Sequence, residues 1–248
     1  MSAPPSPATA PALAVERLNA WYGAAQVLYD VTFSVGRGEV VALMGRNGAG
    51  KSTTMKAVMG LLARRSGTVR LNGRDISALP PFEIARLGLG FTPEDRRIFS
   101  DLSVLENLDA GRQPRTFADG TPAPAWTPEA LFRLFPNLAE LRHRLGGRMS
   151  GGEQQMLTIA RTLMGNPLVV LLDEPSEGIA PVIVEEIADT IVELKKRGLS
   201  ILLSEQNVGF AEIVSDRAYM LERGQIRWGG TMAELADNAE VQRNYLTL

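Results

Sequence analysis

The stretch at residues 45–53, GRNGAGKST, constrains this chain more than any other. A buried-strand pattern at 39–44 precedes it, and a helical pattern at 54–62 follows it. Strand, glycine-rich turn and helix in this order are the context that the pattern G-x-x-x-x-G-K-[ST] needs to bind a polyphosphate. Glycines let successive backbone N–H groups point inward, and the helix N-terminus adds unsatisfied donors and a positive dipole end. The sequence therefore predicts a nucleotide-binding domain.

Each part of this loop has an expected task. Lys51 is long enough to reach the β- and γ-phosphates of a nucleotide, and the Ser52 hydroxyl is a ligand for Mg²⁺. A chance glycine-rich loop is the alternative, and the flanking strand and helix argue against it. The residues expected to bind the phosphates are Gly45, Arg46, Asn47, Gly48, Ala49, Gly50, Lys51, Ser52 and Thr53.

Composition removes several other kinds of site. The chain has 248 residues, no cysteine and one histidine, His143, so disulfides, thiol catalysis and zinc sites built on cysteine or histidine are excluded. The net charge of −2 does not favour nucleic acid as a partner. No apolar run reaches the roughly 18 residues of a membrane span. If the protein works at a membrane, other chains must hold it there.

Strand and helix patterns predict a single domain at 12–248. Residues 1–11 form a Pro/Ala-rich tail without the basic start or apolar core of a signal peptide, and we expect it to be disordered. Buried strands that alternate with helices are typical of an α/β fold with a parallel sheet. Antiparallel strands are expected at 13–18, 27–35 and 66–73, buried strands at 89–92, 168–172 and 200–204, and an exposed loop at 113–128. Helices are expected at 80–87, 131–136, 138–145, 153–164, 182–197, 208–216 and 231–246, and a helical subdomain at about 95–162.

Two adjacent carboxylates, Asp173 and Glu174, follow the buried strand at 168–172. Nucleotides bind at the carboxyl ends of parallel strands, so both carboxylates should face the glycine-rich loop. Asp173 would hold Mg²⁺ through Ser52 or water, and Glu174 would orient and polarise the attacking water. Two ordinary acids at a solvent-exposed edge are the alternative, which a phosphate-binding loop in the same domain disfavours.

A second glycine-rich helix start lies at Ser150, Gly151, Gly152 and Glu153. A serine at a helix start with glycines in the first turn is a second anion-binding end. One nucleotide in the loop at 45–53 does not need a second such end within its own chain. A simple N-cap after a glycine turn is the alternative.

Together these motifs resemble those of ABC ATPases. MSGGEQ at 149–154 resembles the signature L-S-G-G-Q, 45–52 resembles Walker A, and 168–174 resembles Walker B. The resemblance runs from about residue 14 to the C-terminus and implies a P-loop NTPase (RecA-like) sheet with an antiparallel β layer. Residues 93–99, 173–181 and 204–207 resemble one branch more closely. That branch is the second ATPase subunit of branched-chain (hydrophobic) amino-acid importers, with urea and amide importers as near relatives.

The resemblance implies roles for single residues. Tyr22 matches the aromatic that stacks on adenine, and Trp21 beside it is a competing candidate. Glu94 stands where most ABC proteins carry the Q-loop glutamine, and its carboxylate keeps an oxygen for Mg²⁺. Gln206 replaces the switch histidine and can hydrogen-bond a γ-phosphate or water but cannot be charged. Ile179 stands at the usual D-loop aspartate.

The resemblance also implies partners. ABC ATPases work as head-to-tail dimers with two ATP molecules in the interface, so Ser150–Glu153 of one chain would face the γ-phosphate held by the other. ATP would close the dimer and hydrolysis would open it. The second ATPase is expected to be a different chain, with a second copy as the alternative. Permease subunits would contact the Glu94 loop and the helices at 98–145 on the cytoplasmic face of the inner membrane, and a periplasmic solute-binding protein would take part indirectly.

The sequence thus predicts the ATP-binding and hydrolysing subunit of an importer of branched-chain or related amino acids, with ATP and Mg²⁺ as cofactors. One alternative is a soluble ABC-class ATPase acting on nucleic acid or ribosomes, a class that usually carries two linked ABC domains or a long coiled-coil insertion. The other alternative is an ATP-gated assembly module with weak hydrolysis. Glu94, Ile179 and Gln206 keep that second alternative open.

Overall fold

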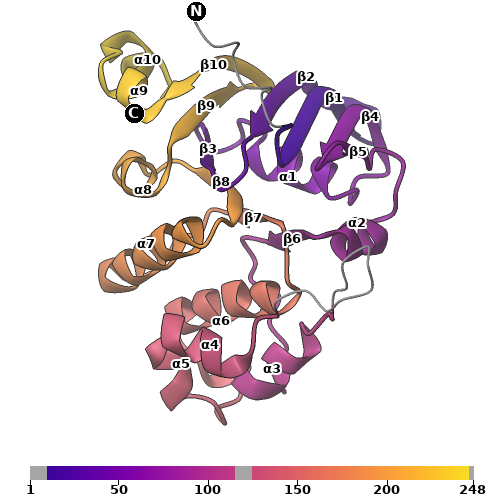
Figure 1. Ribbon diagram of the computed structural model, residues 1–248. Helices are drawn as coiled ribbons and strands as arrows, with labels where there is room; N and C mark the ends of the chain where they lie inside the picture. The colour runs from indigo at the N-terminus through magenta and orange to yellow at the C-terminus, as the bar shows by residue number, and fades with distance from the viewer. Residues whose placement is uncertain (1–9, 115–124, 246–248) are drawn as a thin grey trace, which may run out of the picture.

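The computed structural model describes residues 10–114 and 125–245, which form two sheets flanked by helices (Figure 1). The larger sheet has the strand order β10-β9-β3-β8-β7-β6, and its neighbouring strands are parallel except for the antiparallel pair β9 and β10. Its strands are β3 (Val40–Met44), β6 (Leu89–Thr92), β7 (Val169–Asp173), β8 (Ser200–Glu205), β9 (Arg217–Glu222) and β10 (Gln225–Thr231).

The smaller sheet is antiparallel and has the order β2-β1-β4-β5. The expected antiparallel layer is therefore confirmed. The first two strands extend past their expected bounds because Trp21 pairs with Gln26 and Tyr22 with Ala25 in a tight hairpin. The strands of this sheet are β1 (Leu13–Tyr22), β2 (Ala25–Val35), β4 (Arg64–Leu71) and β5 (Arg74–Asp75).

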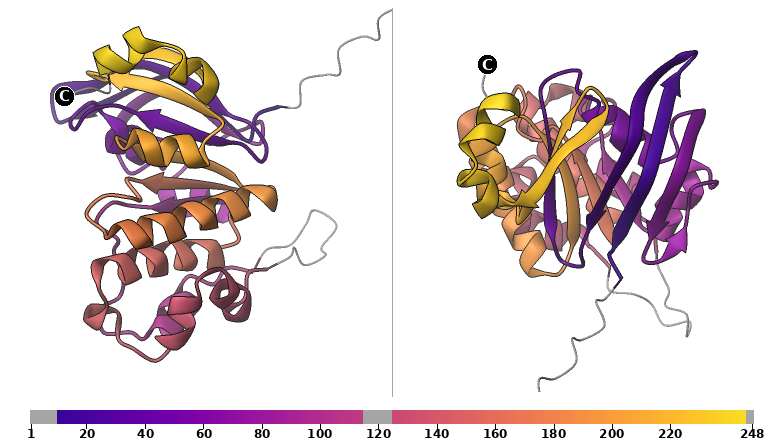
Figure 2. Two further views of the ribbon diagram at one scale, coloured as in Figure 1. Left: turned by 90° about the vertical axis from the view of Figure 1, so that its left-hand side faces the viewer. Right: turned by 90° about the horizontal axis from the view of Figure 1, so that it is seen from above.

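Helices α6 and α7 run beside each other along the parallel sheet, with α3, α4 and α5 beyond them, and α1 lies on the side of the antiparallel sheet (Figures 1 and 2). The helices are α1 (Lys51–Val58), α2 (Pro81–Leu87), α3 (Val104–Ala110), α4 (Pro128–Leu134), α5 (Pro136–Glu140), α6 (Gly151–Met164), α7 (Pro181–Lys196), α8 (Val208–Val214), α9 (Met232–Ala236) and α10 (Ala239–Tyr245), with a 3₁₀ turn at Gly146–Arg148. No helix within 10–114 and 125–245 has the length and apolar character to cross a membrane.

Strand β3 shows why the central strands are unbroken apolar runs in the sequence. Val40, Ala42 and Met44 pack into the core on the α6 and α7 side, whereas Val41 and Leu43 pack into the core shared with the antiparallel sheet. Successive strand residues point to opposite faces, so a strand buried on both faces needs apolar residues at every position. Since β8 pairs in parallel with both β3 and β7, the carboxyl ends of these three strands lie at one edge of the sheet.

Several expected boundaries are wrong. The helix expected at 138–145 ends at Glu140, and the chain then turns. Sequence analysis also gave no bounds for α3, which starts with a capping box between Ser103 and Glu106. The single helix expected at 231–246 is two helices, and the side chain of Asn238 caps the second by accepting from Val241 N at 3.0 Å. Residues 1–9 of the expected tail and 115–124 of the expected loop lie outside the described residues.

Candidate functional site

The loop after β3 ends in an uncapped helix start. Gly48 and Gly50 have φ angles of 79° and 112°, which bend the chain into α1. Among the described residues no side chain caps α1, and its first turn contains no acidic residue. The N–H groups of this helix start are therefore available to an anion.

The turn between β9 and β10 supports this loop from behind. Gly224 N donates to Ala49 O at 2.8 Å. A Cβ on Gly45 would lie 2.3 Å from the Leu221 carbonyl oxygen, so only glycine fits there without a backbone shift. Contacts with a segment about 175 residues later in the chain thus hold the loop in place.

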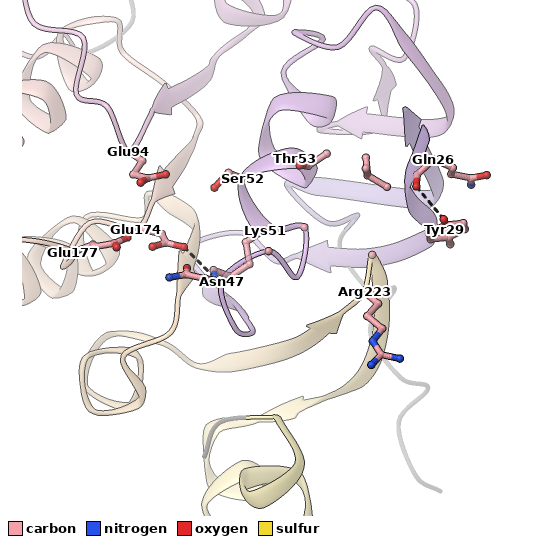
Figure 3. Close-up of a pocket in the computed structure, with 14 residues that line it drawn as sticks. Gln26, Tyr29, Asn47, Lys51, Ser52, Thr53, Glu94, Glu174, Glu177 and Arg223 are labelled. Carbon is pink, nitrogen blue, oxygen red and sulfur yellow. Dashed lines mark hydrogen bonds and ion pairs between the residues drawn. The ribbon is translucent and has the colours of Figure 1, made fainter. Parts of the chain in front are cut away.

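Lys51 and Glu174 form a buried ion pair at the bottom of the site (Figure 3). Lys51 Nζ lies 3.0 Å from Glu174 Oε1, and the two side chains are 3% and 6% exposed. The same ammonium donates to Gly45 O at 2.8 Å and Arg46 O at 3.3 Å. The structure therefore brings together the expected phosphate-binding lysine and the expected general base.

Asp173 lies beside this pair and offers oxygen ligands. Its Oδ1 accepts from Ser52 Oγ at 2.9 Å and from Ser204 Oγ at 2.7 Å. Its Oδ2 is buried and has no hydrogen-bond partner among the described residues. Burial raises the pKa of Asp173 against the lowering effect of these hydrogen bonds. A buried oxygen without a partner, next to a serine hydroxyl, fits Mg²⁺, which takes few protein oxygens and completes its shell with phosphates and water.

Two further side chains surround the Glu174 carboxylate. Gln206 Nε2 donates to Glu174 Oε2 at 3.3 Å, so the expected base and the expected switch residue are in contact. Burial opposes ionisation of Glu174, but hydrogen bonds from Glu177 and Lys51 outweigh it and lower its pKa. The hydrogen bond with Glu174, partial burial and the nearby charges of Glu174 and Glu94 raise the pKa of Glu177 to about 7. Sequence analysis gave Glu177 no role.

A cavity of about 540 Å³ opens above these residues. Figure 3 shows Glu94, Glu174 and Glu177 on one side of it, and Gln26, Tyr29 and Arg223 on the other. Sequence analysis did not identify Tyr29 and Arg223, which come from segments without a phosphate-binding motif. Tyr22 is 49% exposed at the end of β1 and is not among the lining residues, and Trp21 lies under the Arg64 guanidinium.

The second glycine-rich helix start lies apart from this cavity. Ser150 caps α6: its Oγ accepts from Glu153 N at 3.3 Å, and the Glu153 carboxylate accepts from Ser150 N at 2.6 Å. Ser150 is exposed, whereas Gly152 is buried against Ile183 of α7. None of residues 150–153 lines the cavity. The two helix starts therefore do not form one site within this chain.

Comparisons with known proteins place these motifs in a family context. The ABC transporter family matches residues 28–177. The high-affinity branched-chain amino acid transport ATP-binding protein BraG of Pseudomonas aeruginosa is 42% identical over 234 residues, which cover 94% of this chain and 99% of BraG. The lipopolysaccharide export system ATP-binding protein LptB of Haemophilus influenzae is 38% identical over 94% of this chain and 96% of LptB.

Solved structures agree with the fold. A nucleotide-free ATP-binding cassette from an ABC transporter has a TM-score of 0.78 and 28% identity, over 94% of this chain and 97% of the cassette. The ADP conformation of another cassette has a TM-score of 0.76 and 27% identity, over 95% of this chain and 98% of that one. These matches confirm the expected fold, a parallel P-loop sheet with an antiparallel layer and helices.

Proposed function

Since this chain belongs to the ABC transporter family, we propose that it is the ATP-hydrolysing subunit of an importer for branched-chain or related amino acids. One observation carries the hydrolytic part: Lys51 and Ser52 of the glycine-rich loop contact Glu174 and Asp173 at the end of β7. These are the groups that phosphoryl transfer to water requires, because that reaction depends mainly on positioning and charge neutralisation.

In the proposed reaction the phosphates of ATP replace Glu174 as the partner of the Lys51 ammonium. The Glu174 carboxylate is then free to accept a proton from the attacking water. The water oxygen bonds to the γ-phosphorus, and the bond to the β–γ bridging oxygen breaks and leaves ADP. Gln206, which donates to Glu174 at 3.3 Å, orients the carboxylate.

Residues of this chain would also hold Mg²⁺. The Ser52 hydroxyl and the unpartnered Oδ2 of Asp173 are the first candidates, and Glu94 on the cavity wall offers another carboxylate. The ion would supply neutralisation of the phosphate charge.

The exposed start of α6 supports a role between chains. Ser150, Gly151, Gly152 and Glu153 would face the γ-phosphate bound by a second ATPase subunit, either a different chain or a second copy. Tyr22, exposed at the end of β1, would stack on adenine. The domain at 12–248, with its helical subdomain at about 95–162, would lie peripherally on the cytoplasmic face of the inner membrane. The conformational changes that ATP binding and hydrolysis cause in this domain would be transmitted to permease subunits there.

The amino-acid substrate rests on likeness to relatives. BraG and a probable branched-chain amino acid transport ATP-binding protein, LivF of Archaeoglobus fulgidus, which is 36% identical, support import. The LptB likeness favours a second candidate, the ATPase of a lipopolysaccharide exporter. The two candidates share the ATPase chemistry and differ in their membrane partners.

The Glu174→Gln variant tests the hydrolytic role. We expect ATP turnover to be lost while ATP binds more tightly, because Lys51 no longer has a charged partner, and we expect an ATP-bound dimer to accumulate. Glu193→Gln, which changes a glutamate paired with Arg197 on α7, is the control. Turnover, nucleotide affinity and gel filtration are the measurements. A Glu174→Gln protein with wild-type turnover would show that Glu174 is not the base.

Affinity capture from detergent-solubilised membranes of the host tests the transport role. Two permease chains and a second ATPase are expected, and the accompanying solute-binding protein can then be screened for branched-chain amino acids. Lipid-export membrane proteins in the capture would favour the second candidate. Ribosomes or soluble partners alone would contradict both.

A further inference from the structure

Glu205 is a buried carboxylate that sequence analysis passed over. It is the last residue of β8, immediately before Gln206, and it is 2% exposed. Burying a carboxylate costs free energy unless hydrogen bonds compensate it, and burial raises the pKa of Glu205. A residue of this kind at the edge of the site needs an explanation other than core packing.

The hydrogen bonds of Glu205 connect two loops. Its Oε1 accepts from Ser176 N at 3.1 Å, in the loop that follows β7. Its Oε2 accepts from Gln206 N and Asn207 N, each at 3.2 Å, in the loop that follows β8. One carboxylate therefore binds three backbone N–H groups and joins the segment after Glu174 to the segment that carries Gln206.

These two loops bear the groups proposed for water activation. Gln206 Nε2 reaches Glu174 Oε2 at 3.3 Å, so a small displacement of either loop would break the contact. Ser204 makes a second link between the ends of β7 and β8. Its Oγ accepts from Glu174 N at 3.0 Å and donates to Asp173 Oδ1 at 2.7 Å. Ser204 fixes the strand end, and Glu205 fixes the loops beyond it.

We propose that Glu205 is a positioning residue for ATP hydrolysis, which holds the Gln206 amide against the Glu174 carboxylate by joining their two loops. The inference rests on the proposed ATPase activity. Glu205 is buried and is not among the residues that line the cavity, so we expect it to act through the two loops and not by contact with ATP. Its removal should therefore change the rate of the chemical step and leave nucleotide binding intact.

Glu205→Gln is the first test, because the side chain keeps its size but one oxygen becomes an amide that cannot accept from N–H. We expect kcat for ATP to fall by at least about tenfold, because even a small misplacement of a catalytic group slows the chemical step strongly. KM should change less than about twofold, because the glycine-rich loop is untouched. Glu39→Gln is the matched control, because Glu39 precedes β3, away from the site, where it accepts from Gly36 N at 2.6 Å and pairs with Arg217 at 2.6 Å. Its replacement should leave kcat unchanged.

A double-mutant cycle with Gln206→Ala separates positioning from general stability. If Glu205 acts through Gln206, its replacement adds little once the Gln206 amide is gone, and the two losses of kcat do not multiply. Independent losses that multiply fully would overturn the inference. If Glu205→Gln is too unstable to purify, Glu205→Asp keeps the charge but is one methylene too short to join both loops, and the same loss of kcat is expected.

The outcomes distinguish this inference from the function on which it rests. Wild-type protein without ATP turnover would overturn the proposed ATPase. Active wild-type protein together with a Glu205→Gln or Glu205→Asp variant of wild-type kcat would overturn the role of Glu205 and leave the ATPase standing.

Discussion

The two glycine-rich helix starts differ in whether side chains of the chain itself satisfy their backbone donors. At α1, among the described residues, no side chain caps the helix, and the nearby side chains are Lys51, Ser52 and Asp173. At α6, Ser150 and Glu153 form a reciprocal capping box. The first helix start leaves its donors for an anion, and the second satisfies part of them within its own chain.

This difference fits our proposal that α1 forms a nucleotide site within one chain and that the α6 start acts only with a second chain. The α1 site combines a glycine-rich loop, a cation and carboxylates from one chain, and the β9–β10 turn packs against its loop. The α6 start is stable without a ligand and lies outside the cavity. A site that is complete in one chain should fail when its own residues change. A site that needs a second chain should fail only in the assembly.

The largest effect is expected from Lys51→Ala. ATP affinity should fall at least about a hundredfold, since the buried cation of the phosphate site is gone, and Glu174 is left buried without its charge partner, which costs about 3–5 kcal/mol of stability. Nucleotide titration and chemical denaturation measure the two effects, with exposed Lys196→Ala as control. Wild-type ATP affinity in the Lys51→Ala protein would contradict the proposal that the α1 site is complete within one chain.

The next largest effects are expected from alanine substitutions at Gly45 in the α1 site and at Gly151 at the α6 start, and the two variants should behave differently. A Cβ on Gly45 meets the Leu221 carbonyl at 2.3 Å, so Gly45→Ala must shift backbone and should lose about 1–3 kcal/mol of stability along with ATP affinity. A Cβ on Gly151 meets only the end of the flexible Arg96 side chain, at 2.9 Å. Gly151→Ala should therefore fold and bind ATP normally but fail in ATP-dependent dimerisation. Thermal unfolding, nucleotide titration and gel filtration measure stability, ATP affinity and dimerisation. Equal destabilisation by the two substitutions would contradict the proposed difference between the two helix starts.

Ser150→Ala should have a smaller effect on stability, about 1 kcal/mol from loss of the cap. ATP binding to the single chain should be unchanged, and turnover should fall because the α6 start is altered in the dimer. Ser103→Ala is a close control, since Ser103 and Glu106 form the same capping box at α3. It should lose similar stability and keep its turnover. If Ser103→Ala loses turnover equally, the α6 start has no special role.

The smallest expected effect is a pH dependence from Glu177, which faces Glu174, Glu94 and Lys51 in the α1 site. Its pKa of about 7 in the folded protein lies above the usual 4.5, so the folded state holds the proton more tightly than the unfolded chain. Its contribution to stability is therefore present at low pH and is lost as the pH rises through about 7. The added negative charge should also weaken ATP binding slightly between pH 6 and 8. Nucleotide titrations across this range should show no such trend in Glu177→Gln, and an unchanged trend would rule out Glu177 as its source.

Sequence alone determined the features that depend on one segment or on a general rule of the fold. The order of strand, glycine-rich turn and helix around Lys51 is local, so its spacing predicts it directly. The meeting of Asp173 and Ser52 follows from a rule as well, since parallel strands present their carboxyl ends at one edge. The same reasoning failed at α3 and at 138–145, where short helices depend on packing more than on periodicity.

Only the tertiary structure decided which side chains meet across the sheet. Three contacts join segments that lie far apart in the sequence. They are the ion pair between Lys51 and Glu174, the close approach of the Leu221 carbonyl to Gly45, and the hydrogen bond from Ser176 N to Glu205. Such contacts depend on the strand order and register, in which β3 and β7 both flank β8, and no local pattern encodes these. Local chemistry in the sequence therefore specified the phosphate site, whereas the packing of distant strands set the partners of its charges.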